Sequence, residues 1–150
     1  MRFTVAGTVQ GVGFRPTVYR LATELGLRGT VRNNGANVII DVDSDAGFID
    51  LLKERLPALA YIESCTMEDI PLTNDIAGFS IVESGYEGKG VGIPSDTAVC
   101  PECLKEMRGD GRRAGYAFTT CTECGARFTL MGSMPYDRQR TSMDEYPMCE

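Results

Sequence analysis

Hydrophobic and polar residues alternate along residues 1–9 of the chain. Phe3 and Val5 fall on one face with small or polar residues between them, and this two-residue period is typical of a strand. From Pro16 onward, apolar residues recur at helical spacing until Gly26, which favours a helix C-terminus. The pattern therefore predicts a strand, a glycine-containing loop and a helix.

Two further strands are predicted over residues 28–33 and 37–43, where β-branched and apolar residues gather. The Asn34-Gly35 dipeptide between them is a strong signal for a tight hairpin turn. We therefore expect the two strands to pair with each other.

A second helix is predicted directly after this hairpin. Ser44 or Asp45 can cap its start, and Pro57 follows its last turn. The residues on its predicted stripe are Phe48, Leu51, Leu52, Arg55 and Leu56. Strands over residues 61–68 and 79–82 complete the pattern.

The order strand-helix-strand-strand-helix-strand, with a short final strand, matches the ferredoxin-like plan. In this α+β fold two helices pack on one face of an antiparallel sheet. We expect the domain to span residues 1–83. Residues 84–97 are rich in Gly, Ser and Pro and lack periodicity, which is typical of a linker. Hydrophobic periodicity almost disappears in residues 98–150, so we expect a small module there without a core of its own.

Composition narrows the classes of function. The 150 residues carry a formal net charge of −6 and no basic block, so non-specific binding to nucleic acid or to an acidic membrane has no electrostatic driver. The chain contains no histidine, which removes the commonest general base and the commonest metal ligand. It shows neither a signal peptide nor an apolar run of about 20 residues, so we expect a soluble, cytoplasmic protein.

The junction between the first strand and the first helix reads VQGVGFRP and predicts an anion-binding loop. A helix N-terminus exposes unpaired N–H groups, and glycines let several amides point to one centre, while Arg15 adds a planar cation. The candidate phosphate-binding residues are Gln10, Gly11, Val12, Gly13, Phe14 and Arg15. The phosphate loops GxxxxGKS/T and GxGxxG do not match this stretch. A tight turn with a surface arginine is the structural alternative.

The run GTVQGVGFR at residues 7–15 and the run GTVRN at residues 29–33 resemble the signature of the acylphosphatase family, whose fold is also ferredoxin-like. The resemblance implies that Arg15 binds phosphate and that Asn33 orients the attacking water. An acyl phosphate is a mixed anhydride with a good leaving group. Holding the phosphoryl group and positioning water therefore suffice for hydrolysis without histidine or metal.

Two CxxC pairs, Cys100 with Cys103 and Cys121 with Cys124, are separated by seventeen residues. Four thiolates at this spacing predict a tetrahedral, structural Zn²⁺ site, and the absence of histidine requires all four ligands to be sulfur. A thioredoxin-like redox pair and disulfides are the alternatives. Because this segment has little apolar core, we expect the metal to supply much of its folding energy.

Two further cysteines stand apart from these pairs. Cys65 lies in the predicted strand 61–68, where we expect a small, half-buried thiol. Cys149 is a possible ligand of a second zinc site that is truncated at the end of the chain. Residues 99–150 contain seven Lys and Arg against eight Asp and Glu, so a nucleic-acid-binding zinc protein is the weaker alternative.

A wider resemblance is carried by the stretches IPSDTAVCPECLKEM, YAFTTCTECGARFTLM and MPYDRQRTSMDEYPMC. Together with the acylphosphatase signature they resemble the N-terminal portion of the HypF family of NiFe-hydrogenase maturation carbamoyltransferases. The resemblance implies a piece that hydrolyses carbamoyl phosphate or other acyl phosphates. Transfer of the carbamoyl group to a hydrogenase maturation partner protein is expected of the full-length family protein only. A non-catalytic docking and scaffold module, or a standalone acylphosphatase with a zinc tail, are the alternatives.

Overall fold

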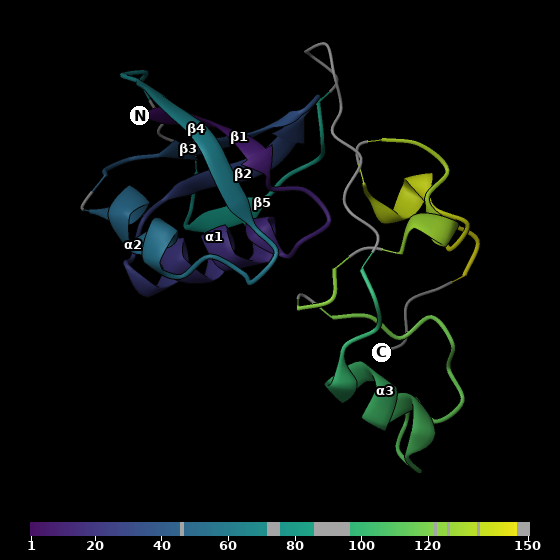
Figure 1. Ribbon diagram of the computed structural model, residues 1–150. Coiled ribbons are helices and arrows are strands. Elements are labelled where there is room, and N and C mark those ends of the chain that lie inside the picture. Colours follow the sequence, from purple (N-terminus) through teal and green to yellow (C-terminus); the bar gives the residue numbers. More distant parts are fainter. Residues whose placement is uncertain are drawn as a thin grey trace.

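Five strands and two helices make up the first half of the computed structural model, and the described residues of the second half contain one α-helix and two 3-10 helices (Figure 1). The structure describes residues 1–45, 47–71, 76–85, 97–121, 123–125, 127–134 and 136–146. The elements are β1 (Arg2–Thr8), α1 (Phe14–Glu24), β2 (Gly29–Asn34), β3 (Asn37–Val42), α2 (Phe48–Glu54), β4 (Tyr61–Glu68), β5 (Phe79–Ile81), α3 (Pro101–Arg108), η1 (Phe128–Leu130) and η2 (Arg138–Arg140). None of the helices in these ranges has the length and apolar character needed to cross a membrane.

The five strands form one sheet in the order β4-β1-β3-β2-β5. β1 pairs antiparallel with β3 and β4, and β2 pairs antiparallel with β3. β5 pairs parallel with β2, with Val31 opposite Ile81. The predicted antiparallel pairing therefore holds for β1–β4, whereas the short final strand, for which no direction was predicted, runs parallel to β2. A parallel pair needs a long crossover connection, and here the whole β3-α2-β4 segment separates β2 from β5.

The core lies between the sheet and the two helices, which cover one face of it (Figure 1). α1 contributes Val18 and Leu21, α2 contributes Phe48 and Leu52, and all four are at most 2% exposed. Val5 and other alternate strand residues meet them from the sheet. Burial of each such side chain contributes about 1.5–3 kcal/mol. This packing fixes the start of α1, where the predicted anion-binding loop ends.

The start of α2 differs from the prediction. The helix begins at Phe48 after Gly47, whose backbone is left-handed (φ 74°), and no side chain caps it. Ser44 and Asp45 are therefore not side-chain caps. The Phe48 N–H instead donates to the main-chain carbonyl of Asp45 at 2.5 Å. The helix also ends before Arg55, one of the residues assigned to its stripe.

The hairpin turn lies one residue further along than predicted. Asn34 pairs with Asn37, so Gly35 and Ala36 form the two-residue turn. Gly35 has a φ of 58°, a left-handed conformation that glycine adopts without steric cost. The shift leaves Asn33 inside β2, close to the end of the strand.

The second half has almost no apolar interior. α3, which the sequence analysis did not predict, begins at Pro101 after Cys100, whose sulfur accepts a hydrogen bond from the Cys103 N–H. Among the described residues from 97 onward, Cys103 and Cys124 are the only buried apolar side chains. This agrees with the loss of hydrophobic periodicity, and it leaves the sulfur cluster as the centre of this part of the chain.

Candidate functional site

The predicted anion-binding loop follows β1 and ends at α1. Gly11 and Gly13 have left-handed backbones, with φ of 71° and 77°, which glycine tolerates because it lacks a Cβ. Val12 and Phe14 are buried in the hydrophobic core. The apolar side chains therefore anchor the loop while its two glycines line a pocket.

The N–H groups of this loop are open to a ligand. No hydrogen bond within the described residues engages the N–H of Gly11, Gly13 or Arg15. The N-cap of α1 is Gly13, which has no side chain to satisfy the first turn. The positive end of the helix dipole therefore lies behind these donors, as a phosphate site requires.

Gln10 fixes the loop in place. Its side chain is buried, and Nε2 donates to the carbonyl oxygens of Gly35 at 2.8 Å and Asn37 at 3.4 Å. Gly35 lies in the β2–β3 turn, and Asn37 directly follows it. Gln10 therefore ties the loop to the end of β2, the strand that carries Asn33.

Asn33 is fully buried, and neither its amide nitrogen nor its amide oxygen has a hydrogen-bond partner in the described residues. Its main-chain carbonyl accepts a hydrogen bond from the Gly85 N–H at 2.8 Å. An unpartnered buried amide costs about 1–3 kcal/mol, so stability does not explain this residue. Arg15 lines a pocket, described below, that Asn33 does not line. The structure therefore does not bring these two predicted residues into one open cavity.

A pocket of about 390 Å³ separates the loop from the second half of the chain. Its first wall consists of Val9, Gly11, Gly13, Phe14, Arg15 and Pro16. Its second wall consists of Thr120, Cys121, Gly125, Tyr136, Asp137 and Arg138. The sequence analysis predicted the first wall alone.

Arg15 forms an ion pair with the second wall. Its Nη2 donates to Asp137 Oδ1 at 2.7 Å and to the carbonyl oxygen of Tyr136 at 3.3 Å. Asp137 Oδ2 accepts a hydrogen bond from the Ser84 hydroxyl at 2.5 Å. The Arg15 and Asp137 side chains are 19% and 23% exposed, so the pair is largely shielded from water.

Sequence reasoning missed the roles of Asp137 and Ser84. Arg15 and Asp137 are 122 positions apart, and no periodicity or short motif links residues at such a distance. The one available signal was the specific MPYDRQRTSM stretch, which contains Asp137 and to which no role was given.

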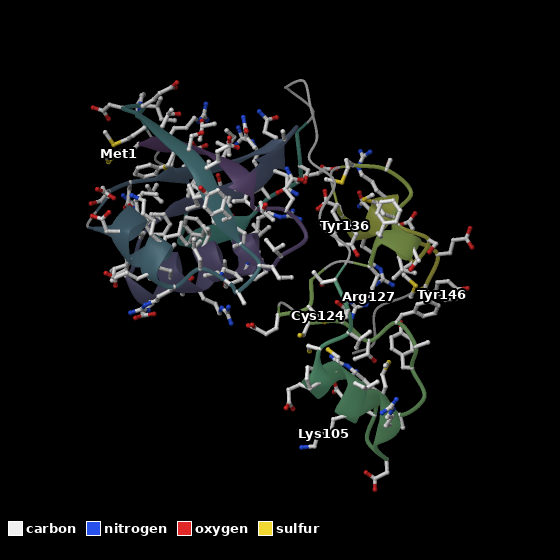
Figure 2. The ribbon with its side chains drawn as sticks, in the orientation of Figure 1. Met1, Lys105, Cys124, Arg127, Tyr136 and Tyr146 are labelled. Atoms are coloured by element: carbon white, nitrogen blue, oxygen red, sulfur yellow. The ribbon has the colours of Figure 1, made fainter. Side chains whose placement is uncertain are left out.

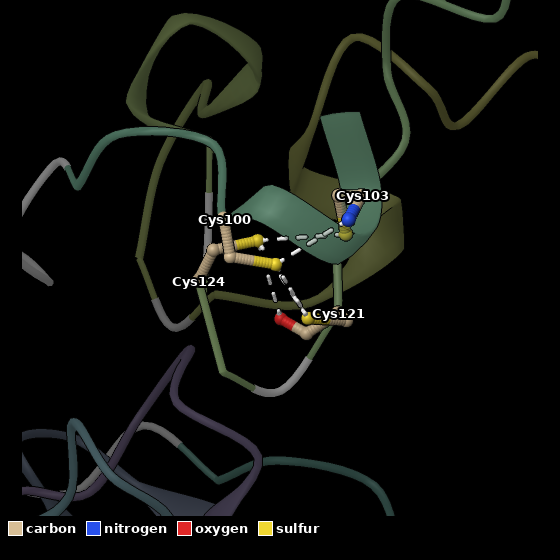
Figure 3. A group of neighbouring side chains, drawn as sticks. All are labelled: Cys100, Cys103, Cys121 and Cys124. Carbon is tan, nitrogen blue, oxygen red and sulfur yellow. Dashed lines mark hydrogen bonds between the residues drawn. The ribbon is translucent and has the colours of Figure 1, made fainter. Parts of the chain in front are cut away.

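Four cysteines form a second candidate site (Figure 3). Cys100 and Cys103 lie at the start of α3, and Cys121 and Cys124 lie on a turn that faces it. The four sulfurs all lie within 4.8 Å of one another, and three of their separations are 3.6, 3.7 and 3.8 Å. A tetrahedral zinc with bonds of about 2.3 Å holds its sulfurs about 3.8 Å apart. The four thiols, none of which forms a disulfide, therefore fit Zn²⁺ as they stand.

Arg127 supports this sulfur cluster. Its Nη2 donates to Cys124 Sγ at 3.1 Å and to the carbonyl oxygen of Thr119 at 3.2 Å. Burial opposes ionisation of Cys124, but backbone hydrogen bonds and the Arg127 guanidinium outweigh it and lower the pKa of this thiol to about 5. Burial and the neighbouring thiols raise the pKa of Cys103. A bound dication favours the thiolate at every ligand.

Tyr136 connects the two candidate sites. Its hydroxyl oxygen accepts a hydrogen bond from the Arg127 main-chain N–H at 3.2 Å, and its carbonyl oxygen accepts one from Arg15. Figure 2 shows Tyr136, Arg127 and Cys124 along the side of the second half that faces the sheet. A short chain of contacts thus runs from the sulfur cluster to the anion-binding loop.

Gly125 brings the zinc-binding turn onto the loop. It has a φ of 67°, and a Cβ at this position would lie 3.2 Å from both the Gly11 carbonyl oxygen and Leu59 Cδ1. Only the hydrogen of a glycine fits this approach comfortably. The residue after Cys124 therefore packs directly against the backbone of the loop.

The other two cysteines lie outside these sites. Cys65 is half-buried in β4 opposite Val5, as the sequence predicted, and burial raises the pKa of its thiol. Cys149 lies outside the described residues, as does most of the predicted linker 84–97. The role of Cys149 as a ligand of a second zinc site stays a prediction.

Comparison with known families assigns a family to the first half of the chain. The sequence model described as acylphosphatase matches residues 1–81. The chain belongs to the acylphosphatase family. The acylphosphatase of Lactobacillus johnsonii is 39% identical to it over 83 residues, which cover 52% of this chain and 91% of that protein. The ferredoxin-like acylphosphatase fold predicted from the sequence is confirmed.

The rest of this acylphosphatase-family chain matches a second family. The model described as HypF finger matches residues 99–131, a range that contains all four clustered cysteines. Carbamoyltransferase HypF of Rhodobacter capsulatus is 46% identical over 149 residues, which cover 99% of this chain and 20% of that protein. The crystal structure of full-length HypF in the phosphate- and nucleotide-bound form matches with a TM-score of 0.86 at 37% identity, over 99% of this chain and 20% of that one.

The chain therefore spans about a fifth of the length of its HypF relatives. Within that fifth it combines an acylphosphatase domain with a HypF zinc finger, as the sequence stretches predicted. The four-cysteine cluster is the zinc centre of this finger.

Proposed function

We propose that the acylphosphatase domain hydrolyses acyl phosphates at the glycine loop. The observation that carries the proposal is the set of unengaged N–H groups at Gly11 and Gly13, which lie beside the Arg15 guanidinium at the start of α1. Such donors suit the non-bridging oxygens of a phosphoryl group. Hydrolysis then depends mainly on positioning and on charge stabilisation.

Asn33 is the proposed water-orienting residue. Its buried amide offers one acceptor and one donor group without protein partners, which are the groups that a held water needs. The water oxygen attacks phosphorus, the bond from phosphorus to the acyl oxygen breaks, and the carboxylate leaves. The proton of the water passes to the phosphoryl oxygen. No histidine is needed because the leaving group is good.

Carbamoyl phosphate is the proposed substrate, and its hydrolysis gives carbamate and inorganic phosphate. Support comes from the similarity of the chain, over 99% of its length, to a protein named carbamoyltransferase. We further propose that residues 1–83 supply this step within a longer cytoplasmic protein, with 84–97 as a linker and 98–150 as the zinc-finger module. Carbamoyl transfer to a partner protein in hydrogenase maturation belongs to that longer protein.

A docking module is the second candidate function. The observation that favours it is the Arg15–Asp137 ion pair, since a site whose arginine is already engaged can hold a phosphate group without turning it over. In this case the loop binds carbamoyl phosphate and the zinc finger acts as a scaffold.

Phosphate release tests the two candidates. The zinc-loaded chain is incubated with carbamoyl phosphate or with acetyl phosphate, without ATP, beside Arg15→Ala and Arg20→Ala. Arg20 lies on the same helix, is exposed and bonds only to Thr17 among the described residues, so it is a matched control for the lost charge.

The hydrolase proposal expects turnover in the wild type and in Arg20→Ala, and its loss by about 10²-fold or more in Arg15→Ala. Turnover that survives in Arg15→Ala contradicts the site. Phosphate binding without turnover in the folded wild type favours the docking function.

A further inference from the structure

The Arg15 guanidinium can bind an oxyanion through either of two pairs of N–H groups, and Nη2 belongs to both pairs. A guanidinium grips an oxyanion with two parallel N–H groups, either from Nε and Nη2 or from Nη1 and Nη2. Nη2 is the nitrogen that donates to Asp137 and to the Tyr136 carbonyl. An incoming phosphate therefore competes with Asp137 and with the Tyr136 carbonyl for the nitrogen that both bidentate arrangements need.

Asp137 presents to Arg15 the group that a phosphate would present, which is an anionic oxygen. The Nη2 to Oδ1 distance of 2.7 Å is that of a charge-assisted hydrogen bond. The Ser84 hydroxyl holds the other carboxylate oxygen at 2.5 Å. Ser84 is in turn placed by its neighbour Gly85, whose N–H donates to the Asn33 carbonyl. The carboxylate is thus held at the loop from two sides.

The charges of the pocket add to this effect. Its charged lining residues are Arg15, Asp137 and Arg138, so one of its two cations is matched by a carboxylate. A phosphate bound by Arg15 would lie beside that carboxylate, and like charges a few ångströms apart repel, more strongly where water is excluded. The pair is only about one-fifth exposed, so screening by solvent is limited.

We propose that Asp137 is an internal competitor for the anion-binding loop. It occupies Arg15 when no ligand is bound and lowers the affinity of the loop for phosphate-type anions, which must displace it. The inference rests on the proposed function in taking this loop as the phosphate site. For the proposed reaction, Asp137 favours departure of the inorganic phosphate that hydrolysis produces.

Binding of inorganic phosphate to the zinc-loaded chain, measured by isothermal titration calorimetry, tests this proposal. The variants are Asp137→Ala, Asp137→Asn and Ser84→Ala, with Asp144→Asn as the control. Asp144 lies in the same part of the chain and is exposed, so it matches the change in net charge without touching the pocket. Zinc content and the far-UV spectrum establish that each variant is folded.

We expect Asp137→Ala to bind phosphate about tenfold more tightly, which corresponds to about 1.4 kcal/mol. Asp137→Asn keeps an acceptor for Arg15 but removes the charge, so it should gain a smaller factor, as should Ser84→Ala. Asp144→Asn should change the dissociation constant less than twofold. An unchanged dissociation constant in both Asp137 variants overturns the proposal. Weaker binding in them also overturns it, and shows that the ion pair positions Arg15 for its ligand.

The double variant Arg15→Ala/Asp137→Ala separates this inference from the function on which it rests. Loss of the gained affinity in the double variant shows that phosphate binds at Arg15. Retained affinity shows that phosphate binds elsewhere, and both proposals then fail. Tighter phosphate binding in Asp137→Ala without hydrolysis by any variant supports the competitor and contradicts the hydrolase.

Discussion

Asn33 combines complete burial with an amide that has no partner among the described residues. At a position with a purely structural role, an apolar side chain of similar size would be the more stable choice, because it avoids the cost of an unsatisfied polar group. The neighbouring positions of β2 follow this logic, since Val31 is a fully buried apolar residue. We therefore propose that function opposes stability at Asn33.

The change Asn33→Val tests that opposition. Valine suits a strand, so we expect the melting temperature to be maintained or raised. We expect kcat for acyl phosphate hydrolysis to fall by about 10²-fold with little change in KM, because the water and not the phosphoryl group is affected. Thr30→Val on the same strand is the control and should leave kcat unchanged. A fall in melting temperature with normal kcat would assign Asn33 a structural role.

Several site residues could be predicted because their chemistry is local. Arg15 stands in a contiguous glycine motif, and the four clustered cysteines stand in pairs with fixed spacing. Arg127 and Asp137 could not be predicted this way. Each has a charge that is common on surfaces, and its role depends on which distant atom the fold brings to it.

At the scale of elements, Arg28 and Asp43 join the two strands of the β2–β3 hairpin at the end opposite its turn. The Arg28 N–H donates to Asp43 Oδ1 and its Nε to Oδ2, both at 3.0 Å. Burial opposes ionisation of Asp43, but these hydrogen bonds outweigh it and hold the pKa of the carboxyl below its ordinary value. The hairpin that carries Asn33 is therefore stabilised by an ionised aspartate.

This arrangement predicts a pH dependence of stability. A carboxyl whose pKa is lower in the folded state stabilises the fold above its unfolded pKa of about 4, and this contribution is lost as the pH falls through the folded value. We expect Asp43→Asn to lower the free energy of unfolding at pH 7, and the difference from wild type to shrink below about pH 4. Urea unfolding at both pH values measures it. An equal difference at pH 7 and pH 3 would contradict the assignment.

Element positions were predictable where apolar periodicity was strong, as in β1 and α1. The start of α2 was not, because a left-handed Gly47 replaced the expected side-chain cap. The direction of β5 was not predictable either, since the pattern of three residues does not indicate whether the strand runs parallel or antiparallel to its neighbour. α3 was missed because its buried face consists of a single cysteine.

At the scale of the whole molecule, the two halves are stabilised by different forces. The core cluster draws its buried members from residues 3–79, whereas the second half buries few side chains besides Cys103 and Cys124 in the described ranges. The first half is therefore held by apolar packing, and we expect the second to be held by the bonds between zinc and sulfur.

Removal of zinc should unfold the second half and leave the first half folded. We expect a chelator to abolish the amide resonance dispersion of residues 97–146 while the resonances of residues 1–71 keep their dispersion, because the first half retains its core. A ¹⁵N-HSQC spectrum before and after chelation measures this. Cys65→Ser removes a thiol outside the cluster and should leave the response unchanged, whereas Cys121→Ser should mimic chelation. Loss of dispersion throughout the chain would contradict independent folding of the first half.

The ion pair between Arg15 and Asp137 also has a thermodynamic consequence, because it joins these two halves. If an anion at the loop displaces Asp137, it removes a contact that holds the zinc-finger half in place. Free-energy changes around such a cycle must be reciprocal. The factor by which zinc loading lowers the affinity for the anion is then the factor by which a bound anion lowers the affinity for zinc. Zinc binding and substrate binding would thus each weaken the other through a single hydrogen-bonded carboxylate.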